Sequence, residues 1–341
     1  MSKERVFLTG GSGRIGRRVL RKLLERGYAV RSLVHTRRAE GPAHPGLETV
    51  QGDILDQDGL KKLLPGCSYV VHLAAAWDMF PPAVHEKENN QLFESVVRGT
   101  YNLLEASYPA KELKCFLYAS TDAVYATGPR KFDAPITEDT ELQPSRFYAL
   151  GKIVCESLCR NYGKLYGLPW LAVRICWCLD VDEILRIFGY DFWEGGLSPE
   201  DRARLTPRLA GKGVFAPLMP DGSSGVDHVS DPEDIAEGIA LGVDRHAAAL
   251  GGVYNLAGPA NFRYLELIEK LAADLGSPWG SAPVKGIEPY ELSIERARRV
   301  LGYDPQYPIQ RMLANAVRHA KEGGAIARYG GAPAALMQAV R

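Results

Sequence analysis

The chain has 341 residues, and its 41 Lys and Arg residues balance its 41 Asp and Glu residues, so the formal net charge is zero. A dedicated DNA- or RNA-binding protein or a polybasic membrane-surface protein carries a positive excess, so we expect no nucleic-acid partner and no membrane partner. The apolar fraction of 46% and the charged fraction of 24% are ordinary for a globular protein and exclude a disordered chain.

Short apolar segments alternate with helical patterns in the first half of the chain. Strands are predicted at 5–9, 29–34, 48–51, 69–73, 115–119 and 170–175. Helices are predicted between them, at 15–24, 56–64, 84–107 and 147–166. This alternation predicts an α/β fold in which helices cover both faces of a parallel sheet.

The regular alternation stops near residue 176. Residues 180–225 are rich in glycine, proline and aromatic residues and show no clear period. Beyond them a strand is predicted at 252–256, and helices are predicted at 232–243, 263–275, 291–301 and 309–321.

The cysteines and the chain start indicate the cellular setting. Six cysteines occur without a Cys-x-x-Cys pair and without histidines at zinc spacing, so we expect buried, reduced thiols and no metal site. The first residues run straight into a strand-like segment instead of a signal peptide. No apolar run reaches the roughly 18 residues of a membrane span, and we expect a cytoplasmic protein.

A glycine-rich turn lies between the first strand and the first helix. Gly10, Gly13 and Gly16 stand in the segment Thr-Gly-Gly-Ser-Gly-Arg-Ile-Gly. Such glycines permit a tight turn that brings the backbone close to a pyrophosphate, which then faces the helix N-terminus. We therefore predict a dinucleotide site that also includes Arg14 and Ile15, and the alternative is a purely structural turn.

The ends of the next strands supply further candidates for the dinucleotide site. Arg37 and Arg38 follow the second strand, where an acidic residue would favour NAD, so NADP is slightly favoured over NAD. The alternative is that both arginines are solvated loop charges. After the third strand, Asp53 can accept from an adenine amino group while Ile54 packs on the ring; the alternative is a helix cap.

The fourth strand ends in small residues. His72 is expected to be a packed histidine. The residues after it leave room for a ligand at the carboxyl end of the sheet, namely Leu73, Ala74 and Ala75.

Tyr148 and Lys152 carry the most specific chemical signal. Four residues apart on a predicted helix, they lie on one face, so Lys152 can lower the pKa of Tyr148 from about 10. A tyrosine tuned in this way can exchange a proton with a substrate oxygen. Ser120 and Thr121 end the fifth strand, and a hydroxyl there faces the same crevice. The alternative for Tyr148 and Lys152 is an unrelated surface pair.

Taken in order, these segments resemble the extended short-chain dehydrogenase/reductase family, which includes nucleotide-sugar epimerases and dehydratases. The matching segments are TGGSGRIG (9–16), GDILD (52–56), HLAAA (72–76), RGTYNLLEAS (98–107), YASTDAVY (118–125), YALGK (148–152), DHVSDPEDIAEGI (227–239), GVYNLAGP (252–259) and RARRVLGYDPQYP (296–308). The resemblance implies a doubly wound Rossmann domain at 1–175 with returning segments at about 226–258. A smaller mixed substrate domain is implied at 176–225 and 259–328, followed by a tail at 329–341.

The resemblance also implies roles for individual residues. Tyr148 would be the general acid/base, Lys152 would lower its pKa and bind the nicotinamide ribose, and Thr121 would orient the substrate oxygen. The implied activity is hydride transfer between nicotinamide and a secondary alcohol or carbonyl. The family often forms homodimers, here through helices matching about 90–107 and 147–163.

Departures from the family pattern bear on the substrate. Asp122 is followed by alanine where dehydratases carry glutamate, and residues 222–228 lack the arginine that pairs with a nucleotide diphosphate. A small sugar-like, polyol or ketone substrate is therefore predicted, with an epimerase as the alternative and a non-catalytic dinucleotide sensor as the remote one. The candidate substrate-binding residues are Trp77, Asp122, Phe192 and Trp193.

Overall fold

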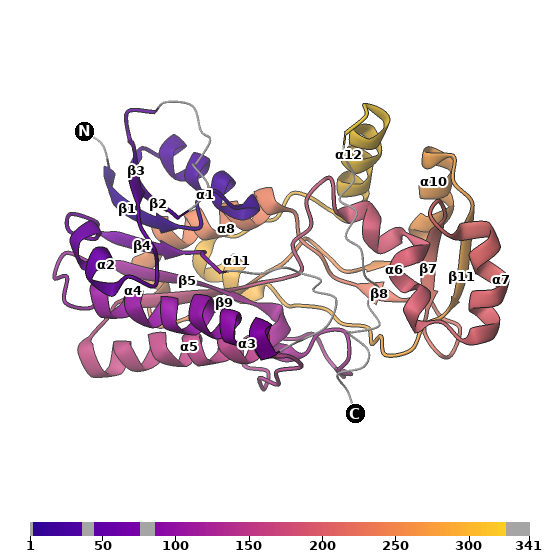
Figure 1. Cartoon of the computed structure of the whole chain (residues 1–341), viewed down its shortest axis with the longest axis horizontal. Coiled ribbons are helices and arrows are strands. Elements are labelled where there is room, and N and C mark those ends of the chain that lie inside the picture. Colours follow the sequence, from indigo (N-terminus) through magenta and orange to yellow (C-terminus); the bar gives the residue numbers. More distant parts are fainter. Residues whose placement is uncertain (1–2, 36–43, 76–85, 325–341) are drawn as a thin grey trace.

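A seven-stranded parallel sheet forms the larger part of the molecule (Figure 1). The computed structural model describes residues 3–35, 44–75 and 86–324. In order across the sheet the strands are β3 (Leu47–Gln51), β2 (Tyr28–Val34), β1 (Lys3–Thr9), β4 (Tyr69–His72), β5 (Cys115–Thr121), β6 (Trp170–Ile175) and β9 (Val253–Leu256). The strand order reverses between β1 and β4, where a sheet of this kind opens a crevice for ligands. The predicted doubly wound α/β class is confirmed.

Helices cover both faces of this sheet because successive strand residues point to opposite sides. In β1, Val6 and Leu8 contribute to one core and Phe7 to the other. The first face carries α1 (Arg14–Glu25), α8 (Pro232–Asp244), α9 (His246–Ala249) and α11 (Glu295–Leu301). The second carries α2 (Gln57–Leu63), α3 (Glu86–Leu92), α4 (Gly99–Ser107) and α5 (Phe147–Tyr166).

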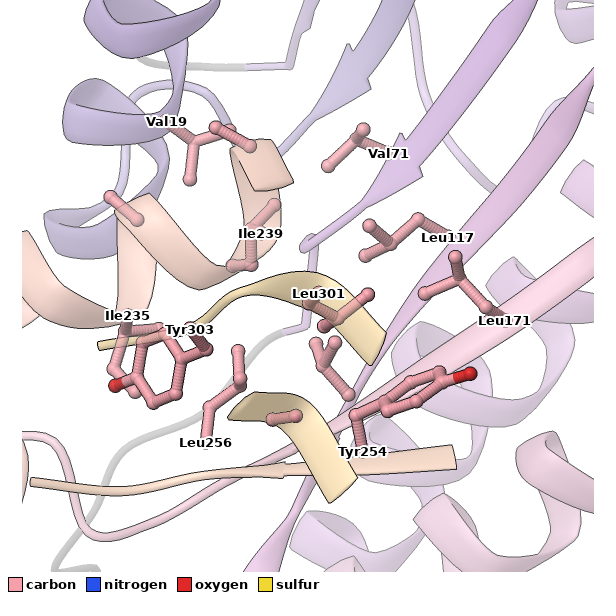
Figure 2. Close-up of a cluster of buried hydrophobic side chains, with 14 of the residues drawn as sticks. Val19, Val71, Leu117, Leu171, Ile235, Ile239, Tyr254, Leu256, Leu301 and Tyr303 are labelled. Carbon is pink, nitrogen blue, oxygen red and sulfur yellow. The ribbon is translucent and has the colours of Figure 1, made fainter. Parts of the chain in front are cut away.

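The core of the first face brings together segments that are distant in the sequence. Figure 2 shows Val19 of α1, Ile239 of α8 and Leu301 of α11 around Val71 and Leu117 of the sheet. The segment 290–303, which the sequence placed with the substrate part, also packs here through Tyr290, Leu292, Ile294, Ala297 and Tyr303. Segments that follow residue 226 in the sequence therefore complete the core of the larger part of the fold.

The helix predicted at 84–107 differs from the expectation in its middle, and Val84 lies outside the described residues. A π-helical stretch, η1 (Phe93–Arg98), separates α3 from α4. Side-chain donors satisfy the carbonyl oxygen of Val96 there, since the Thr100 hydroxyl donates to it at 2.6 Å and the Cys155 thiol at 3.3 Å. Wider turns of this type are frequent near functional sites.

The smaller part has regular structure that the sequence did not predict between 180 and 225. It contains η3 (Ile184–Phe188), α6 (Tyr190–Trp193), η4 (Glu194–Gly196), α7 (Pro199–Leu209) and β7 (Val214–Leu218). Strand β7 pairs in parallel with β11 (Trp279–Pro283), and β8 (Val226–Asp227) pairs in antiparallel with β10 (Phe262–Arg263). The core there is completed by α10 (Leu265–Leu275) and α12 (Ile309–Lys321).

Two further expectations concern cysteines and membranes. All six cysteines are buried and have free thiols. Within residues 3–35, 44–75 and 86–324, none of the helices combines the length and the apolar character needed to span a bilayer.

Candidate active site

The glycine turn between β1 and α1 has no room for a side chain at Gly10 or Gly16, because neighbouring backbone atoms lie too close. Gly10 has φ +74°, and a Cβ there would lie 2.8 Å from the backbone nitrogen of Ala74. A Cβ on Gly16 would lie 1.9 Å from the carbonyl oxygen of Gly10. Gly13 precedes α1, whose N-terminus has no side-chain cap, so its first N–H groups remain available to an anion.

Replacing Gly16 by alanine should weaken NAD or NADP binding by about tenfold or more, because overpacking of this size costs roughly 1–3 kcal/mol. The clash is with backbone, which cannot swing aside as a side chain would. Titration calorimetry with the dinucleotide measures the effect, and Glu25→Ala at the far end of α1 is the control. Unchanged affinity in Gly16→Ala would show that this turn does not hold the dinucleotide.

Arg14 begins α1 and reaches across to the smaller part of the molecule. Its guanidinium forms an ion pair with Glu183, which also accepts from the backbone N–H of Asp180 at 2.9 Å. Asp180 in turn accepts from Arg17 and Arg18. This cluster fastens the chain after β6 to the start of α1, beside the predicted pyrophosphate position.

Asp53 and Ile54 follow the carboxyl end of β3, and neither is among the residues that line the cavity at the ends of β1, β4, β5 and β6. Asp53 accepts from the backbone N–H of Leu55 at 2.9 Å and lies 3.4 Å from the His35 ring nitrogen at the end of β2. Ile54 packs in the second-face core near Gly99. Their predicted place at the adenine end stays a prediction, and Arg37 and Trp77 fall outside the described residues.

His72 is a buried structural histidine. Its two ring nitrogens contact the Thr9 and Thr100 hydroxyls at 2.7 and 3.0 Å, and burial lowers its pKa to about 3. The imidazole is therefore neutral at physiological pH. Beyond it, Leu73 and Ala75 line the cavity, while the backbone N–H of Ala74 donates to Thr9 at 3.2 Å.

A cavity of about 720 Å³ opens at the carboxyl ends of β1, β4, β5 and β6. The glycine turn lines one end through Gly10, Gly13, Arg14, Ile15 and Gly16, and the ends of β5 and α5 line its middle. Ser120, Thr121, Tyr148 and Lys152 all contribute to the wall. The structure thus brings the predicted pyrophosphate turn and the predicted catalytic residues to one cavity.

Lys152 is buried beneath the aromatic rings of this wall. Its ammonium donates to the carbonyl oxygen of Ala119 at 2.7 Å, and it lies 5.6 Å from the centre of the Tyr148 ring. Burial lowers its pKa to about 8. The Thr121 hydroxyl caps the short helix η2 (Asp122–Tyr125) and donates to the Asp122 carboxyl at 3.3 Å.

The predicted lowering of the Tyr148 pKa is not observed. Burial raises the pKa of Tyr148 above its ordinary value, and the nearby carboxylate of Asp122 raises it further. The side chains of Tyr148 and Lys152 do meet, but the ammonium is directed to a backbone carbonyl and lies near the ring. The phenol is therefore protonated at neutral pH in this structure.

The end of the cavity remote from the glycine turn mixes aromatic and charged side chains. Phe192 and Trp193 line it, and both are largely buried in the core of the smaller part, while their predicted role in substrate binding stays a prediction. Sequence reasoning missed Trp177, Arg146 and Asp227, which also line this end. Arg146 stands two residues before Tyr148, and this closeness in the sequence could have indicated that it lies near the cavity.

Two buried carboxyl groups line this same end. Burial raises the pKa of Asp122 to about 6, while the Trp177 backbone N–H opposes the shift. Burial raises the pKa of Asp227 to about 7, and the negative charge of Asp122 adds to it. Ionising either group in the folded protein therefore costs free energy that ionisation in the unfolded chain does not cost.

Asp227→Asn should stabilise the free protein in a pH-dependent way. Because the folded-state pKa exceeds the unfolded value of about 3.9, wild type loses stability relative to the variant as pH rises from about 4 to 7. The gain should reach a few kcal/mol near pH 8 and vanish near pH 4. Thermal unfolding at both pH values measures it, with the exposed Asp221→Asn as control. A gain that does not change with pH would contradict the raised pKa.

The residues present fit a dinucleotide at the glycine-turn end. Backbone there approaches so closely that Gly10 and Gly16 admit no side chain, and α1 presents uncapped N–H groups. Lys152 and Tyr148 stand at the middle of the same cavity, where they could contact the nicotinamide ribose and the reacting atoms.

Comparisons with known proteins agree with this fit. The model of the NAD dependent epimerase/dehydratase family matches residues 6–178. The uncharacterized protein y4nG of Sinorhizobium fredii is 33% identical over 49% of this chain, which spans only 39% of that relative's length. L-arabinose 1-dehydrogenase (NAD(P)(+)) of Haloferax volcanii is 30% identical over 53% of this chain and 69% of its own length.

A solved structure extends the likeness to nearly the whole chain. A short-chain dehydrogenase/reductase superfamily protein from Agrobacterium tumefaciens, solved with bound NAD, superposes with a TM-score of 0.78 at 27% identity. The superposition covers 94% of this chain and 98% of that protein. With the family match over half of the sequence, the chain belongs to the NAD-dependent epimerase/dehydratase family of enzymes, within the extended short-chain dehydrogenases/reductases.

Proposed function

We propose that this protein is an NAD(P)-dependent oxidoreductase that acts on a secondary alcohol or carbonyl of a small sugar-like, polyol or ketone substrate. One observation chiefly supports the proposal. The glycine turn and the residues Thr121, Tyr148 and Lys152 line a single cavity, whose far end has its own aromatic and charged lining.

The chain's own residues handle the proton at the substrate oxygen. The protonated phenol of Tyr148 is the form that donates to a carbonyl oxygen during reduction, and its phenolate would accept the hydroxyl proton during oxidation. Lys152, whose pKa is about 8, can carry a positive charge beside Tyr148. The hydroxyl of Thr121 orients the reacting oxygen. When bound, the nicotinamide supplies or accepts the hydride at the adjacent carbon.

The test is turnover with each dinucleotide and a panel of free sugars, polyols and ketones. Appearance of reduced nicotinamide, followed by its near-ultraviolet absorbance, together with one equivalent of ketone or lactone product supports the proposal. A sugar that is inverted at one carbon without net change in the dinucleotide would identify an epimerase. Binding of the dinucleotide with no conversion of any kind would favour the sensor alternative.

NADP is our proposed preferred dinucleotide. The support is sequence-based, because Arg37 and Arg38 follow β2 and no acid occurs there before Glu40. Arg37→Ala should raise the Michaelis constant for NADP and leave that for NAD unchanged. Equal Michaelis constants for NADP in the variant and wild type would reject a role for Arg37.

We further propose a homodimer in which the helical stretch 90–107 and the helix 147–163 pair with their counterparts. Large apolar side chains are exposed there, Phe93 and Tyr101 on the first and Leu150 and Val154 on the second. An apolar surface of this kind is typical of a protein interface. Sedimentation of Leu150→Glu against wild type tests it, since a dimer held by this face should dissociate in the variant.

A further inference from the structure

The carboxyl group of Asp227 has unused acceptor capacity beside the substrate end of the cavity. The residue is only 8% exposed and lines the cavity from strand β8. Its hydrogen bonds come from the Tyr264 hydroxyl at 3.0 Å and the adjacent His228 backbone N–H at 3.3 Å, and the Tyr290 hydroxyl also lies within reach of it. An ionised carboxyl accepts about four hydrogen bonds. Among the residues that the structure describes, no cation forms an ion pair with it.

The elements around Asp227 hold it in a fixed position. In the β8–β10 ribbon, Asp227 is opposite Phe262, and Tyr264 follows directly after β10. The Tyr264 ring packs against Phe188 at 4.9 Å between ring centres. His228 is fixed from both sides, since its ring contacts the Gly258 carbonyl at 3.0 Å and accepts from the Leu292 N–H at 3.1 Å. A carboxyl held this firmly is prepared for a directional contact.

The charges of the substrate end disfavour an anionic ligand. Asp122, Asp227 and Glu288 line it against Arg146, and the Lys152 ammonium in the adjacent wall donates to the carbonyl oxygen of Ala119. Arg14, at the other end of the cavity, is engaged with Glu183. A phosphate or diphosphate would therefore add negative charge beside these carboxyl groups, which costs free energy or requires the carboxyls to bind protons.

A hydroxylated ligand suits this mixed lining. A hydroxyl group can donate to the carboxyls of Asp122 and Asp227 and accept from a guanidinium or phenol such as Arg146 or Tyr264. A cationic ligand could use only the carboxyls, and Arg146 would repel it. The aromatic rings of Trp177 and Phe192 supply an apolar wall for the carbon skeleton.

We propose that Asp227, together with Asp122, recognises the hydroxyl groups of an uncharged polyhydroxylated substrate, so that the enzyme acts on free sugars or polyols and discriminates against their phosphate and nucleotide derivatives. This inference rests on the proposed function, because it names the substrate class of that same site. Asp227 is a specificity-determining residue in this account, and it takes no part in the proton or hydride transfer.

Binding to a variant with strongly reduced turnover tests the substrate class directly. Titration calorimetry uses Tyr148→Phe saturated with NADP, or with NAD if that binds better. The probes are L-arabinose, D-glucose, xylitol, D-glucosamine, glucose-6-phosphate and UDP-glucose. At least one uncharged probe should bind more tightly than every charged one. Tighter binding of either phosphate derivative or of glucosamine, or no binding of any uncharged probe, would overturn the proposal.

The role of Asp227 is tested with the isosteric Asp227→Asn and the control Asp221→Asn, which alters an exposed loop outside the cavity. Loss of a charge-assisted hydrogen bond should raise the KM of the best uncharged substrate about tenfold or more and leave kcat and dinucleotide affinity nearly unchanged. An unchanged KM in Asp227→Asn would overturn the assignment.

The two proposals can fail separately. Turnover of UDP-glucose but of no free sugar would reject the substrate class while supporting the oxidoreductase or epimerase chemistry. Tight, Asp227-dependent binding of a free sugar without any conversion would reject the chemistry while supporting the substrate class.

Discussion

Replacing Tyr148 by phenylalanine is expected to lower kcat by about 10²–10⁴, the usual contribution of a positioned general acid or base. The change removes only the phenolic oxygen, so the ring that Lys152 lies against remains. Tyr148 is part of the cavity wall beside Thr121 and the buried carboxyl of Asp122. Steady-state turnover with the best substrate measures the effect, and calorimetry with the dinucleotide shows whether binding survives.

The matched control lies on the same helix. Tyr162→Phe also removes a phenolic oxygen from α5, where that hydroxyl donates to Glu105 away from the cavity. Its turnover should equal that of wild type. If Tyr148→Phe kept wild-type turnover, or if both variants lost it equally, Tyr148 would not be the general acid/base.

The second large effect concerns stability. Glu156 of α5 and Arg174 of β6 form a buried ion pair with N–O distances of 2.7 and 3.0 Å and side-chain exposures of 2 and 3%. Glu156→Gln removes the compensating charge from Arg174 and should lower the free energy of unfolding by about 3–5 kcal/mol. The Ser120 hydroxyl, which donates to Glu156 at 2.5 Å beside the cavity, would lose part of its anchoring.

Denaturant unfolding of wild type, Glu156→Gln and a double variant separates the cost of an unpaired buried charge from the cost of altered packing. The double variant Glu156→Gln/Arg174→Met removes both charges and should recover much of the lost stability, because an unpaired buried charge is the main cost. Wild-type stability in Glu156→Gln would contradict the account of a closed, buried pair. A double variant less stable than the single one would contradict the charge explanation.

Much of the larger part could be predicted from the sequence because its signals are local. Apolar strands alternate with helical patterns up to residue 175, and the helix 147–166 has the predicted bounds. The glycine turn could be predicted because its cause is local backbone geometry around Gly10 and Gly16. The spacing of Tyr148 and Lys152 predicted their proximity because helix geometry alone sets it.

The rest depends on contacts between distant segments. The pKa of Tyr148 depends on its burial and on the nearby carboxylate of Asp122, and helix spacing determines neither. Asp227 reaches the cavity only through a two-residue strand paired with β10. The short strands β7 and β11 were missed because each contains a proline and pairs across a gap of some sixty residues.

The most direct test of the hydride transfer is isotopic. The best free sugar or polyol, deuterated at its reacting carbon, is mixed with wild-type enzyme and oxidised dinucleotide, and the nicotinamide is analysed by mass spectrometry. Wild-type enzyme should transfer deuterium to the nicotinamide ring, and Tyr148→Phe should lose this transfer. A dinucleotide that binds in the cavity but acquires no deuterium while the substrate is converted would contradict the proposed hydride transfer.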